Sequence, residues 1–442
     1  MENYIIQGSK PLYGEVAISG AKNAVLPILA ACLLCKETCV IHNVPFLKDV
    51  FVMTEVLEEL GAQLKWEGHT LVINCANVIP KPVKWEISQK MRASNLVLGP
   101  LLGRFGEGEV AYPGGCSIGA RPMDLHLTAL RQFGCKIVET AHGVAANAKR
   151  LHGAVCRLAF PSVGATENAL MAAVLATGET CIQNGAQEPE IIDLVQFLSA
   201  MGAKIQRKAD GTFLVAGVSV LHGAEYTVMP DRIETGTLLI AGALSGGTIA
   251  LHQAKAEHCQ QLLTALAACG VTVIPLQQGL LVKGMPQKQW RPMVLQTLPY
   301  PGFPTDMQPQ MMVLLALSNG ISKVEETLFE NRYRHVQELQ KMGANITLLG
   351  NVAVISGVSH LTGATVSATD LRAGAALVLA GLVAEGSTTV QNISYIDRGY
   401  ERLEEKLNAL GADIRRVPAT VQKLTWQKKC AQILEPMPLG IL

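Results

Sequence analysis

Apolar and polar positions follow the same order in successive segments of about 70 residues along this chain. Each segment begins with small apolar residues that predict a buried helix, followed by a short strand, an amphipathic helix and a pair of strands. In the third segment these elements are Thr166–Leu175, Thr180–Asn184, Ile191–Met201, Lys204–Arg207 and Thr212–Ala216. The first and sixth segments contain corresponding elements at Ala24–Leu34, Thr38–His42, Leu47–Leu60, Ala373–Ala384, Thr388–Asn392 and Tyr400–Leu410.

A glycine follows the second helix of every segment and predicts a left-handed helix cap. These glycines are Gly61, Gly134, Gly202, Gly270, Gly343 and Gly411, with spacings of 68 or 73 residues. Each of the last three lies 209 residues after one of the first three. The six segments therefore form two copies of a three-segment half.

The sixth segment is incomplete, because only Asp413–Val417 follows its glycine. The chain begins with two strand-like stretches, Tyr4–Gln7 and Glu15–Ile18, which we expect to complete that segment. The pattern predicts an α/β fold in which the chain crosses twice between two domains, near residues 20–22 and 230–232. A double crossing favours hinge closure around a ligand in a cleft.

The predicted domains are residues 22–230, residues 1–21 with 231–418, and a tail at 419–442. The tail lies outside the repeat and carries an apolar pattern suited to one helical face, at Leu424, Trp426, Cys430, Ile433 and Leu434. Packing of this face on the protein surface is favoured over a partner site.

Composition adds information about the core and about possible ligands. The 442 residues are 49% hydrophobic but only 17% charged and 5% aromatic. Such a chain is not disordered, and 41 glycines indicate an interior of small and aliphatic side chains. A net charge of +1 excludes a bulk basic field for nucleic acid. An anionic ligand must therefore be held by local clusters of cations.

The eleven cysteines are odd in number and scattered, and Met1–Lys10 is too polar for a signal peptide. This predicts a reducing, cytoplasmic location with most thiols in the core. Cys32 and Cys35 form a CxxC pattern within the apolar run Ala24–Cys35, where core packing is favoured over metal binding. At 12 residues, that run and Ala373–Ala384 are too short to span a membrane.

Charged and polar residues interrupt the repeat where the first helices begin. If equivalent helices point the same way, their N-termini converge and attract anions. The position is occupied by Lys22-Asn23, Arg92, Ser162–Gly164, Asp231-Arg232, Asp306, and Asp370 with Arg372. For any one residue alone a solvated helix cap is the simpler reading, but the recurrence predicts a site for phosphate and carboxylate groups.

The segment Pro113–Pro122 carries three glycines and two prolines, so it is predicted to be a loop before the second helix of segment two. Its thiol, Cys116, lies five residues from Arg121, and a nearby cation favours the thiolate. Cys116 is therefore a candidate general acid or nucleophile, against the simpler reading of an inert loop cysteine. The same connection carries Glu188 and Glu190 in segment three, and Asp397 and Arg398 in segment six.

Several motifs resemble those of the UDP-N-acetylglucosamine 1-carboxyvinyltransferase family over residues 1–418. They are Ser19-Gly-Ala-Lys-Asn23, Met91-Arg-Ala-Ser94, the Pro113–Pro122 loop, Ser162-Val-Gly-Ala-Thr166, Phe303-Pro-Thr-Asp306, Thr369-Asp-Leu-Arg372 and Ile396-Asp-Arg-Gly-Tyr400. The resemblance implies two inside-out α/β domains of three repeats each. It also implies transfer of enolpyruvyl from phosphoenolpyruvate to the 3′-hydroxyl of UDP-N-acetylglucosamine through a tetrahedral ketal, with release of phosphate.

The resemblance also implies roles for individual residues, and it implies no cofactor or metal. Cys116 matches the proton donor, Asp306 the acid–base carboxylate, and Asp370 a second carboxylate near the donor. The phosphoenolpyruvate side matches Lys22, Asn23, Arg121, Arg372 and Arg398. The UDP-sugar side matches Asn23, Arg92, Arg121, Pro122, Met123, Asp124, Leu125, Ser162, Val163, Gly164, Asp306 and Leu328.

Two positions depart from the family pattern. Phe160 stands where some members carry a uridine-side lysine, and Tyr300 stands where some carry a histidine near the sugar. A related transferase acting on shikimate 3-phosphate lacks the cysteine loop, so Cys116 argues against it. A catalytically dead regulator or a protein-binding repeat scaffold would not need the intact charged set. The small-molecule substrates are the expected partners, without nucleic acid or a membrane span.

Overall fold

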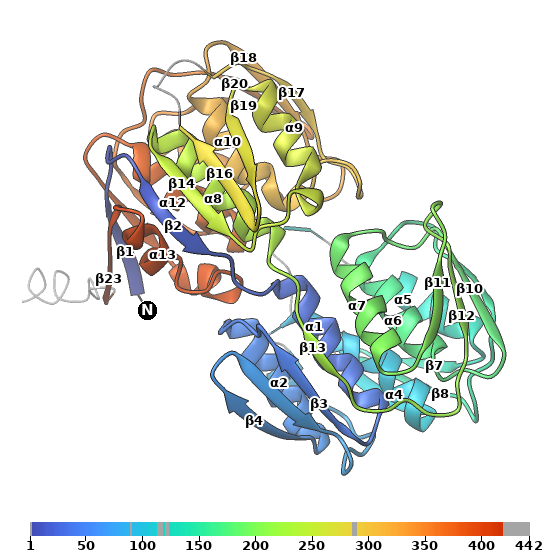
Figure 1. The fold of residues 1–442 in the computed structure, drawn as a ribbon. Helices are drawn as coiled ribbons and strands as arrows, with labels where there is room; N and C mark the ends of the chain where they lie inside the picture. The colour runs from blue at the N-terminus through green and yellow to red at the C-terminus, as the bar shows by residue number, and fades with distance from the viewer. Residues whose placement is uncertain (1, 89–90, 113–117, 120–122, 285–289, 419–442) are drawn as a thin grey trace, which may run out of the picture.

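The protein consists of two lobes, each with its own hydrophobic core (Figure 1). The computed structural model describes residues 2–88, 91–112, 118–119, 123–284 and 290–418. The core of lobe one is drawn from residues 21–229, and the core of lobe two from residues 4–18 and 233–414.

Lobe one contains three repeats of the predicted order of elements. The first comprises α1 (Lys22–Ala31), η1 (Cys32–Leu34), β3 (Thr38–His42), α2 (Lys48–Leu60), β4 (Gln63–Glu67) and β5 (Thr70–Asn74). The second comprises α3 (Trp85–Ser88), η2 (Arg92–Val97), α4 (Leu98–Phe105), β6 (Glu107–Ala111), α5 (Asp124–Gln132), β7 (Lys136–Glu139) and β8 (Gly143–Asn147). The third comprises β9 (Val155–Arg157), α6 (Val163–Ala173), β10 (Glu179–Gln183), α7 (Pro189–Ala200), β11 (Lys204–Arg207), β12 (Phe213–Ala216) and then β13 (Glu225–Thr227).

Lobe two repeats this order. Its first unit comprises α8 (Arg232–Ser245), β14 (Thr248–His252), η3 (Ala256–His258), α9 (Gln260–Ala268), β15 (Thr272–Leu276) and β16 (Gly279–Lys283). The next comprises β17 (Val294–Gln296), η4 (Thr305–Met307), α10 (Gln308–Ala316), β18 (Ile321–Glu325), α11 (Val336–Lys341), β19 (Asn345–Leu349) and β20 (Val352–Ser356). The last comprises β21 (Thr365–Ser367), α12 (Leu371–Val383), β22 (Ser387–Gln391), η5 (Ile393–Arg398), α13 (Leu403–Ala409) and β23 (Asp413–Pro418).

The first helix of each repeat lies inside its lobe, with the sheets outside, which confirms the predicted inside-out α/β fold (Figure 1). Helix α12 is buried at every residue from Arg372 to Val383, and its sequence after Arg372 is small and apolar throughout, as a buried helix requires. Packing is tight at Gly381, where a Cβ would lie 3.0 Å from Ile6 Cδ1. No helix of the described chain is long and apolar enough to cross a membrane.

The glycines that follow the second helices are all left-handed, as predicted. Their φ angles lie between 87° and 105°, at Gly61, Gly134, Gly202, Gly270, Gly343 and Gly411. Because residues with a Cβ rarely adopt this conformation, the six glycines fix where each helix ends and the following strand begins.

The two N-terminal strands separate into different sheets. Strand β1 (Glu2–Gln7) pairs antiparallel with both β22 and β23, so it completes the sixth repeat as predicted. Strand β2 (Tyr13–Ala17) instead runs parallel to β14 in the fourth repeat, so its predicted place was wrong. The reason is that most sheets carry one parallel strand at the edge, as β9, β13, β17 and β21 do.

The two chain crossings between the lobes lie side by side and are tied together. Gly20 and Pro230 form an isolated antiparallel bridge, and the Asp231 N–H donates to the Ser19 carbonyl over 2.9 Å. The Lys22 N–H donates to the Asp231 carboxylate over 3.1 Å. The chain therefore passes between the lobes through one paired hinge rather than two separate linkers.

Candidate active site

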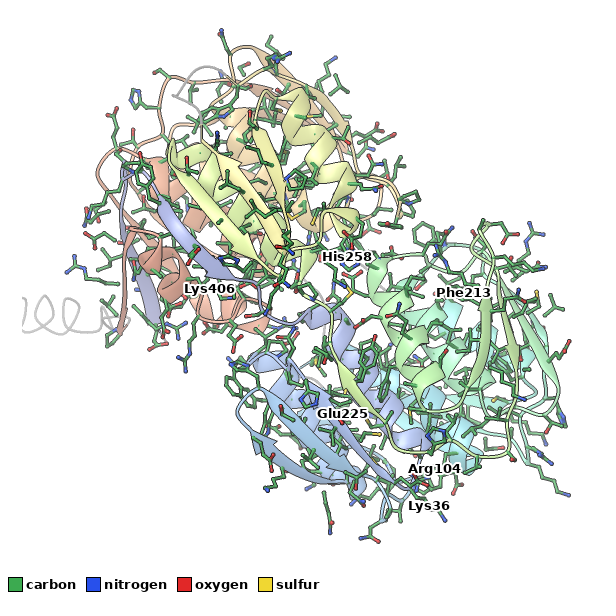
Figure 2. The ribbon with its side chains drawn as sticks, in the orientation of Figure 1. Lys36, Arg104, Phe213, Glu225, His258 and Lys406 are labelled. Carbon is green, nitrogen blue, oxygen red and sulfur yellow. The ribbon has the colours of Figure 1, made fainter. Side chains whose placement is uncertain are left out.

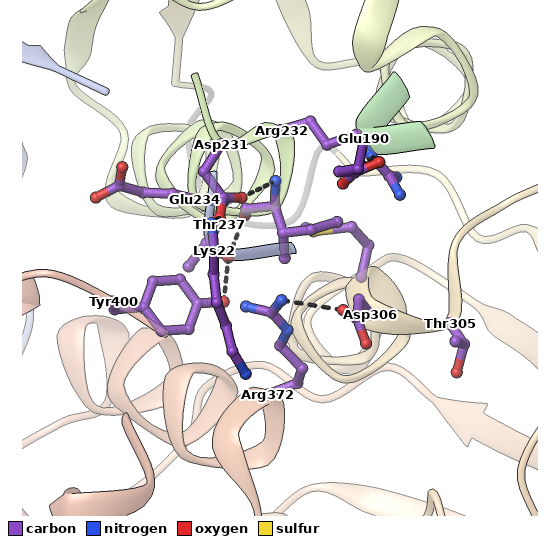
Figure 3. A network of polar contacts seen from close by, with 12 residues as sticks. Lys22, Glu190, Asp231, Arg232, Glu234, Thr237, Thr305, Asp306, Arg372 and Tyr400 are labelled. Carbon is purple, nitrogen blue, oxygen red and sulfur yellow. Dashed lines mark hydrogen bonds and ion pairs between the residues drawn. The ribbon is translucent and has the colours of Figure 1, made fainter. Parts of the chain in front are cut away.

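Charged residues from both lobes gather at the junction beside this hinge (Figure 3). Most of them stand at helix starts, as the repeat pattern predicts. Helix α1 begins at Lys22, and Ser162, Asp231 and Asp370 are the N-caps of α6, α8 and α12. Their side-chain oxygens accept hydrogen bonds from the free N–H groups of the first turn, which fixes each helix start.

The carboxylate of Asp306 lies between two buried arginines. Arg332 Nη2 contacts Asp306 Oδ1 at 2.8 Å, and Arg372 Nη2 contacts Oδ2 at 3.0 Å. The side chains of Arg332 and Arg372 are only 2% and 3% exposed, whereas that of Asp306 is 27% exposed. Asp306 therefore has both oxygens oriented and still reaches solvent at the junction, which suits a group that exchanges a proton with a ligand.

Arg372 is held on two sides and keeps one donor group unused. Burial alone would lower the pKa of Arg372, but Asp306, Tyr400 and Asp231 together outweigh burial and raise that pKa above its usual value. The guanidinium also lies over the ring of Tyr400 at 5.4 Å, and the Tyr400 hydroxyl lies 2.9 Å from Thr237 Oγ1. Among the described residues, nothing accepts a hydrogen bond from the buried Arg372 Nη1. A buried donor of this kind is suited to a ligand oxygen.

Lys22 and Arg398 meet at one carboxylate. Lys22 Nζ lies 2.7 Å from Asp49 Oδ2, and Arg398 Nε lies 2.8 Å from Asp49 Oδ1. Burial alone would raise the pKa of Asp49, but Lys22 and Arg398 together hold it below the usual value. Helix α2 contributes Asp49 from lobe one and η5 contributes Arg398 from lobe two, so this ion pair spans the junction.

A second group of buried acids surrounds Arg232 at the start of α8. Arg232 Nε donates to both oxygens of Glu190, at 2.9 and 3.1 Å. Burial raises the pKa of Glu167 to about 8, and the nearby charges of Glu190 and Glu188 add to the effect. Burial also raises the pKa of Glu188, and the nearby charge of Glu190 adds to the effect.

The other predicted ligand residues lie at different depths. Asn23, Leu125, Ser162, Val163, Gly164 and Leu328 are half-buried, Asp124 is exposed and Met123 is buried. A Cβ on Gly164 would lie 2.9 Å from His126 Cε1, so glycine is needed there for this close approach. The Leu328 N–H donates to Glu326 Oε1 over 2.9 Å, which fixes the backbone beyond β18.

Three predicted site residues, Cys116, Arg121 and Pro122, lie outside the described residues. The backbone of Arg92 begins η2, but its side chain is likewise outside the description. The two described residues of that loop contact lobe two, because the Asn331 N–H donates to the Ile118 carbonyl over 3.1 Å. Ile118 therefore contacts lobe two one residue before Arg332.

The structure describes both residues that depart from the family pattern, Phe160 and Tyr300, and the two cysteines of the CxxC pattern. Phe160 is 45% exposed, and Tyr300 lies in the chain just before η4.

Cys32 and Cys35 are buried, and Arg104 donates to the carbonyls of Leu33, Cys35 and Cys75. Figure 2 shows Arg104 far from the lobe junction, so the predicted core role of these cysteines is confirmed. No group of three or more metal-ligating side chains is found in the described part of the chain.

Sequence reasoning missed two residues of this site, Asp49 and Arg332. Arg332 stands in the strand-to-helix connection of the fifth repeat, the same position that Arg121 and Arg398 occupy in the second and sixth. Asp49 stands in the first turn of a second helix, where Glu190 and Glu338 recur. The repeat therefore carried the signal for both residues.

Comparison with known proteins identifies the family. The model of the EPSP synthase (3-phosphoshikimate 1-carboxyvinyltransferase) family matches residues 6–407. A UDP-N-acetylglucosamine 1-carboxyvinyltransferase of Carboxydothermus hydrogenoformans is 51% identical over 420 residues, covering 94% of this chain and all of the relative. The chain belongs to the UDP-N-acetylglucosamine 1-carboxyvinyltransferase family. The family member of Caldanaerobacter subterraneus subsp. tengcongensis is 50% identical over 414 residues, covering 93% of this chain and 99% of its own.

Solved structures agree with this family on the fold. The enolpyruvyl transferase NikO from Streptomyces tendae superposes with a TM-score of 0.86 at 25% identity, covering 95% of this chain and 99% of its own. EPSP synthase from Acinetobacter baumannii superposes at 0.74 with 15% identity, covering 95% of this chain and 100% of its own. At that identity the second likeness concerns the fold alone.

Proposed function

We propose that this protein transfers enolpyruvyl from phosphoenolpyruvate to the 3′-hydroxyl of UDP-N-acetylglucosamine, the first committed step of peptidoglycan synthesis. The observation that carries the proposal is the identity of about half of all residues, over nearly the whole chain, with relatives named for this reaction. The charged residues gathered at the lobe junction support it, because the reaction needs anion-binding groups beside an acid–base carboxylate.

We assign the acid–base step to Asp306. As the sugar hydroxyl attacks the enol ether carbon, its proton passes to a carboxylate oxygen, while the methylene carbon accepts a proton from Cys116. The tetrahedral ketal then expels phosphate while its new methyl group returns a proton to Cys116, which forms the C=C bond of the enolpyruvyl product, and the proton held by Asp306 leaves with the phosphate. The partial exposure of Asp306 and its fixation by Arg332 and Arg372 support this role, since a proton acceptor must be oriented toward the ligand.

We assign the anionic groups of the donor to the cations at the junction. Lys22 and Arg398, with Arg121 and Asn23, bind the phosphate, and Arg372 with Arg398 binds the carboxylate. The buried Arg372 Nη1, which has no acceptor among the described residues, supports the carboxylate contact. Asp370 keeps the start of α12 and hence Arg372 in place.

We assign the UDP-sugar to the lobe-one side of the junction and to Leu328. The set is the one that the family resemblance implies, namely Asn23, Arg92, Arg121–Leu125, Ser162–Gly164 and Asp306. Each lobe is then one domain, 22–230 and 1–21 with 231–418, which close about the paired hinge. A reducing cytoplasmic compartment suits the thiols, because every cysteine in the described part of the chain is free.

The test is phosphate release from UDP-N-acetylglucosamine and phosphoenolpyruvate by the purified full chain, with and without fosfomycin. We expect release, and we expect fosfomycin to abolish it through alkylation of Cys116, with Cys181→Ser as a matched control that keeps full sensitivity. Folded protein that releases no phosphate would refute the transferase assignment. Release with shikimate 3-phosphate in place of the UDP-sugar would support the alternative acceptor instead.

A further inference from the structure

Two of the cations assigned to the donor phosphate, Lys22 and Arg398, already contact a protein carboxylate. Asp49 Oδ2 accepts from Lys22 Nζ at 2.7 Å and from Arg398 Nη2 at 3.3 Å, and Oδ1 accepts from Arg398 Nε at 2.8 Å. The contact between Arg398 and Asp49 is bidentate, and guanidinium groups make the same kind of contact with phosphate. A phosphate group at the edge of Arg398 formed by Nε and Nη2 therefore needs the same N–H donors that Asp49 uses.

The surroundings favour this carboxylate as a charged partner. The Asp49 side chain is 4% exposed and that of Lys22 is 13% exposed, so water screens the contact little. One carboxylate faces two cations, which leaves a net positive charge of one for the trio. That remaining charge attracts an incoming anion, while Asp49 reduces the attraction.

We propose that Asp49 competes with phosphate for the N–H donors of Lys22 and Arg398. It holds the two cations together when no ligand is bound, and it lowers their affinity for a phosphate group. The proposal rests on the assignment of these two cations under the proposed function. Asp49 is not assigned a chemical step, because it acts only through Lys22 and Arg398.

Such a competitor distinguishes the donor from the product. Phosphoenolpyruvate carries a carboxylate as well as a phosphate, so Arg372 supplies a second point of attachment that offsets the contacts taken from Asp49. Inorganic phosphate lacks that carboxylate and meets the competition from Asp49 alone. Asp49 therefore favours the release of phosphate after transfer more than it opposes the binding of the donor.

Calorimetric binding of inorganic phosphate tests this, because it needs neither acceptor nor turnover. We expect Asp49→Asn to bind phosphate at least about fivefold more tightly than the wild type, within the usual ~5–150-fold range of coupling between two sites. Asp193→Asn is the matched control, since it neutralises a buried carboxylate of lobe one that bonds to Tyr226 and the Met229 N–H. We expect that control to bind phosphate like the wild type.

The direction of the change separates competition from simple loss of structure. A variant whose cations had merely lost their support would bind phosphate more weakly, so weaker or unchanged binding by folded Asp49→Asn would overturn the proposal. Asp49→Glu, which keeps the charge, is expected to restore weak binding. In turnover, Asp49→Asn should also show stronger inhibition by added phosphate and a lower kcat.

A crystal structure of the wild type with inorganic phosphate gives a second test that needs no variant. We expect Asp49 to have lost at least one of its contacts with Lys22 and Arg398. Phosphate bound to both cations with all three contacts intact would overturn the proposal. If the wild type proved inactive but phosphate still displaced Asp49 from Lys22 and Arg398, the proposed function would be refuted and the inference about Asp49 would stand.

Discussion

Replacement of Asp231 by alanine removes the residue that joins the hinge to a buried helix. Its Oδ1 accepts from the N–H groups of Ile233 and Glu234 at 2.7 and 3.0 Å, and its Oδ2 accepts from the Lys22 N–H at 3.1 Å. Asp231 is only 5% exposed, so water replaces these partners poorly. Alanine therefore leaves the start of α8 and the Lys22 N–H without acceptors.

The cost follows from these contacts. Loss of an N-cap costs about 0.5–2 kcal/mol, and an amide hydrogen left without a partner adds about 1–3 kcal/mol. We expect Asp231→Ala to lower the free energy of unfolding by about 2–4 kcal/mol. Asp231→Asn keeps a cap oxygen but turns an amide NH₂ toward Lys22, so it should cost only about 1 kcal/mol.

Urea unfolding is the assay, followed by circular dichroism and by tryptophan fluorescence. Trp290 is fully buried in lobe two, the lobe that contains α8, so it contributes to the fluorescence change when that lobe unfolds. Asp210→Ala is the matched control, because this exposed acid accepts one backbone N–H, from Thr212, in a surface turn. Equal losses for the alanine and asparagine variants, or a loss for Asp231→Ala no larger than that of the control, would refute the reasoning.

Two further predictions concern the site. Asp306→Asn should still bind UDP-N-acetylglucosamine but turn over about 10²–10⁴-fold more slowly, as calorimetry and phosphate release would measure, and near-normal turnover would contradict the acid–base role. Glu167 has a folded-state pKa of about 8 against an ordinary value of 4.5, so the stability that its neutral form contributes is complete below about 4.5 and is lost as the pH rises through about 8. Glu167→Gln should therefore match the wild type in urea unfolding near pH 4.5 and exceed it at pH 9, and parallel pH profiles would contradict the burial argument.

Local signals in the sequence predicted most of the fold. Strand β3 and helix α2 of the first repeat were predicted to within one residue of their ends, because helix caps, glycines and alternation act over a few positions. The sheet of strand β2 was misassigned, because an edge strand reads the same whichever sheet it joins. Pairing between distant segments is set by the packing of the whole lobe.

The site was predicted less completely than the fold. Lys22, Asp306, Arg372 and Arg398 were recognised, since charges at helix starts and in connections interrupt an apolar repeat. Asp49 was missed because an acid in the first turn of an amphipathic helix usually faces solvent, and only the structure shows it buried against two cations. The repeat marked the position of Asp49, but its ion pair with Arg398 joins residues 349 positions apart and cannot be inferred from either segment.

The pairing of β1 with β23 constrains the order in which the chain acquires its structure during synthesis. Glu2 lies opposite Pro418, so the sixth sheet forms only after nearly the whole chain has left the ribosome. Lobe one draws its core from residues 21–229 alone and is complete much earlier. We therefore expect vectorial folding, in which lobe one folds first. Strand β1 stays unpaired until the last strands of lobe two have been synthesised.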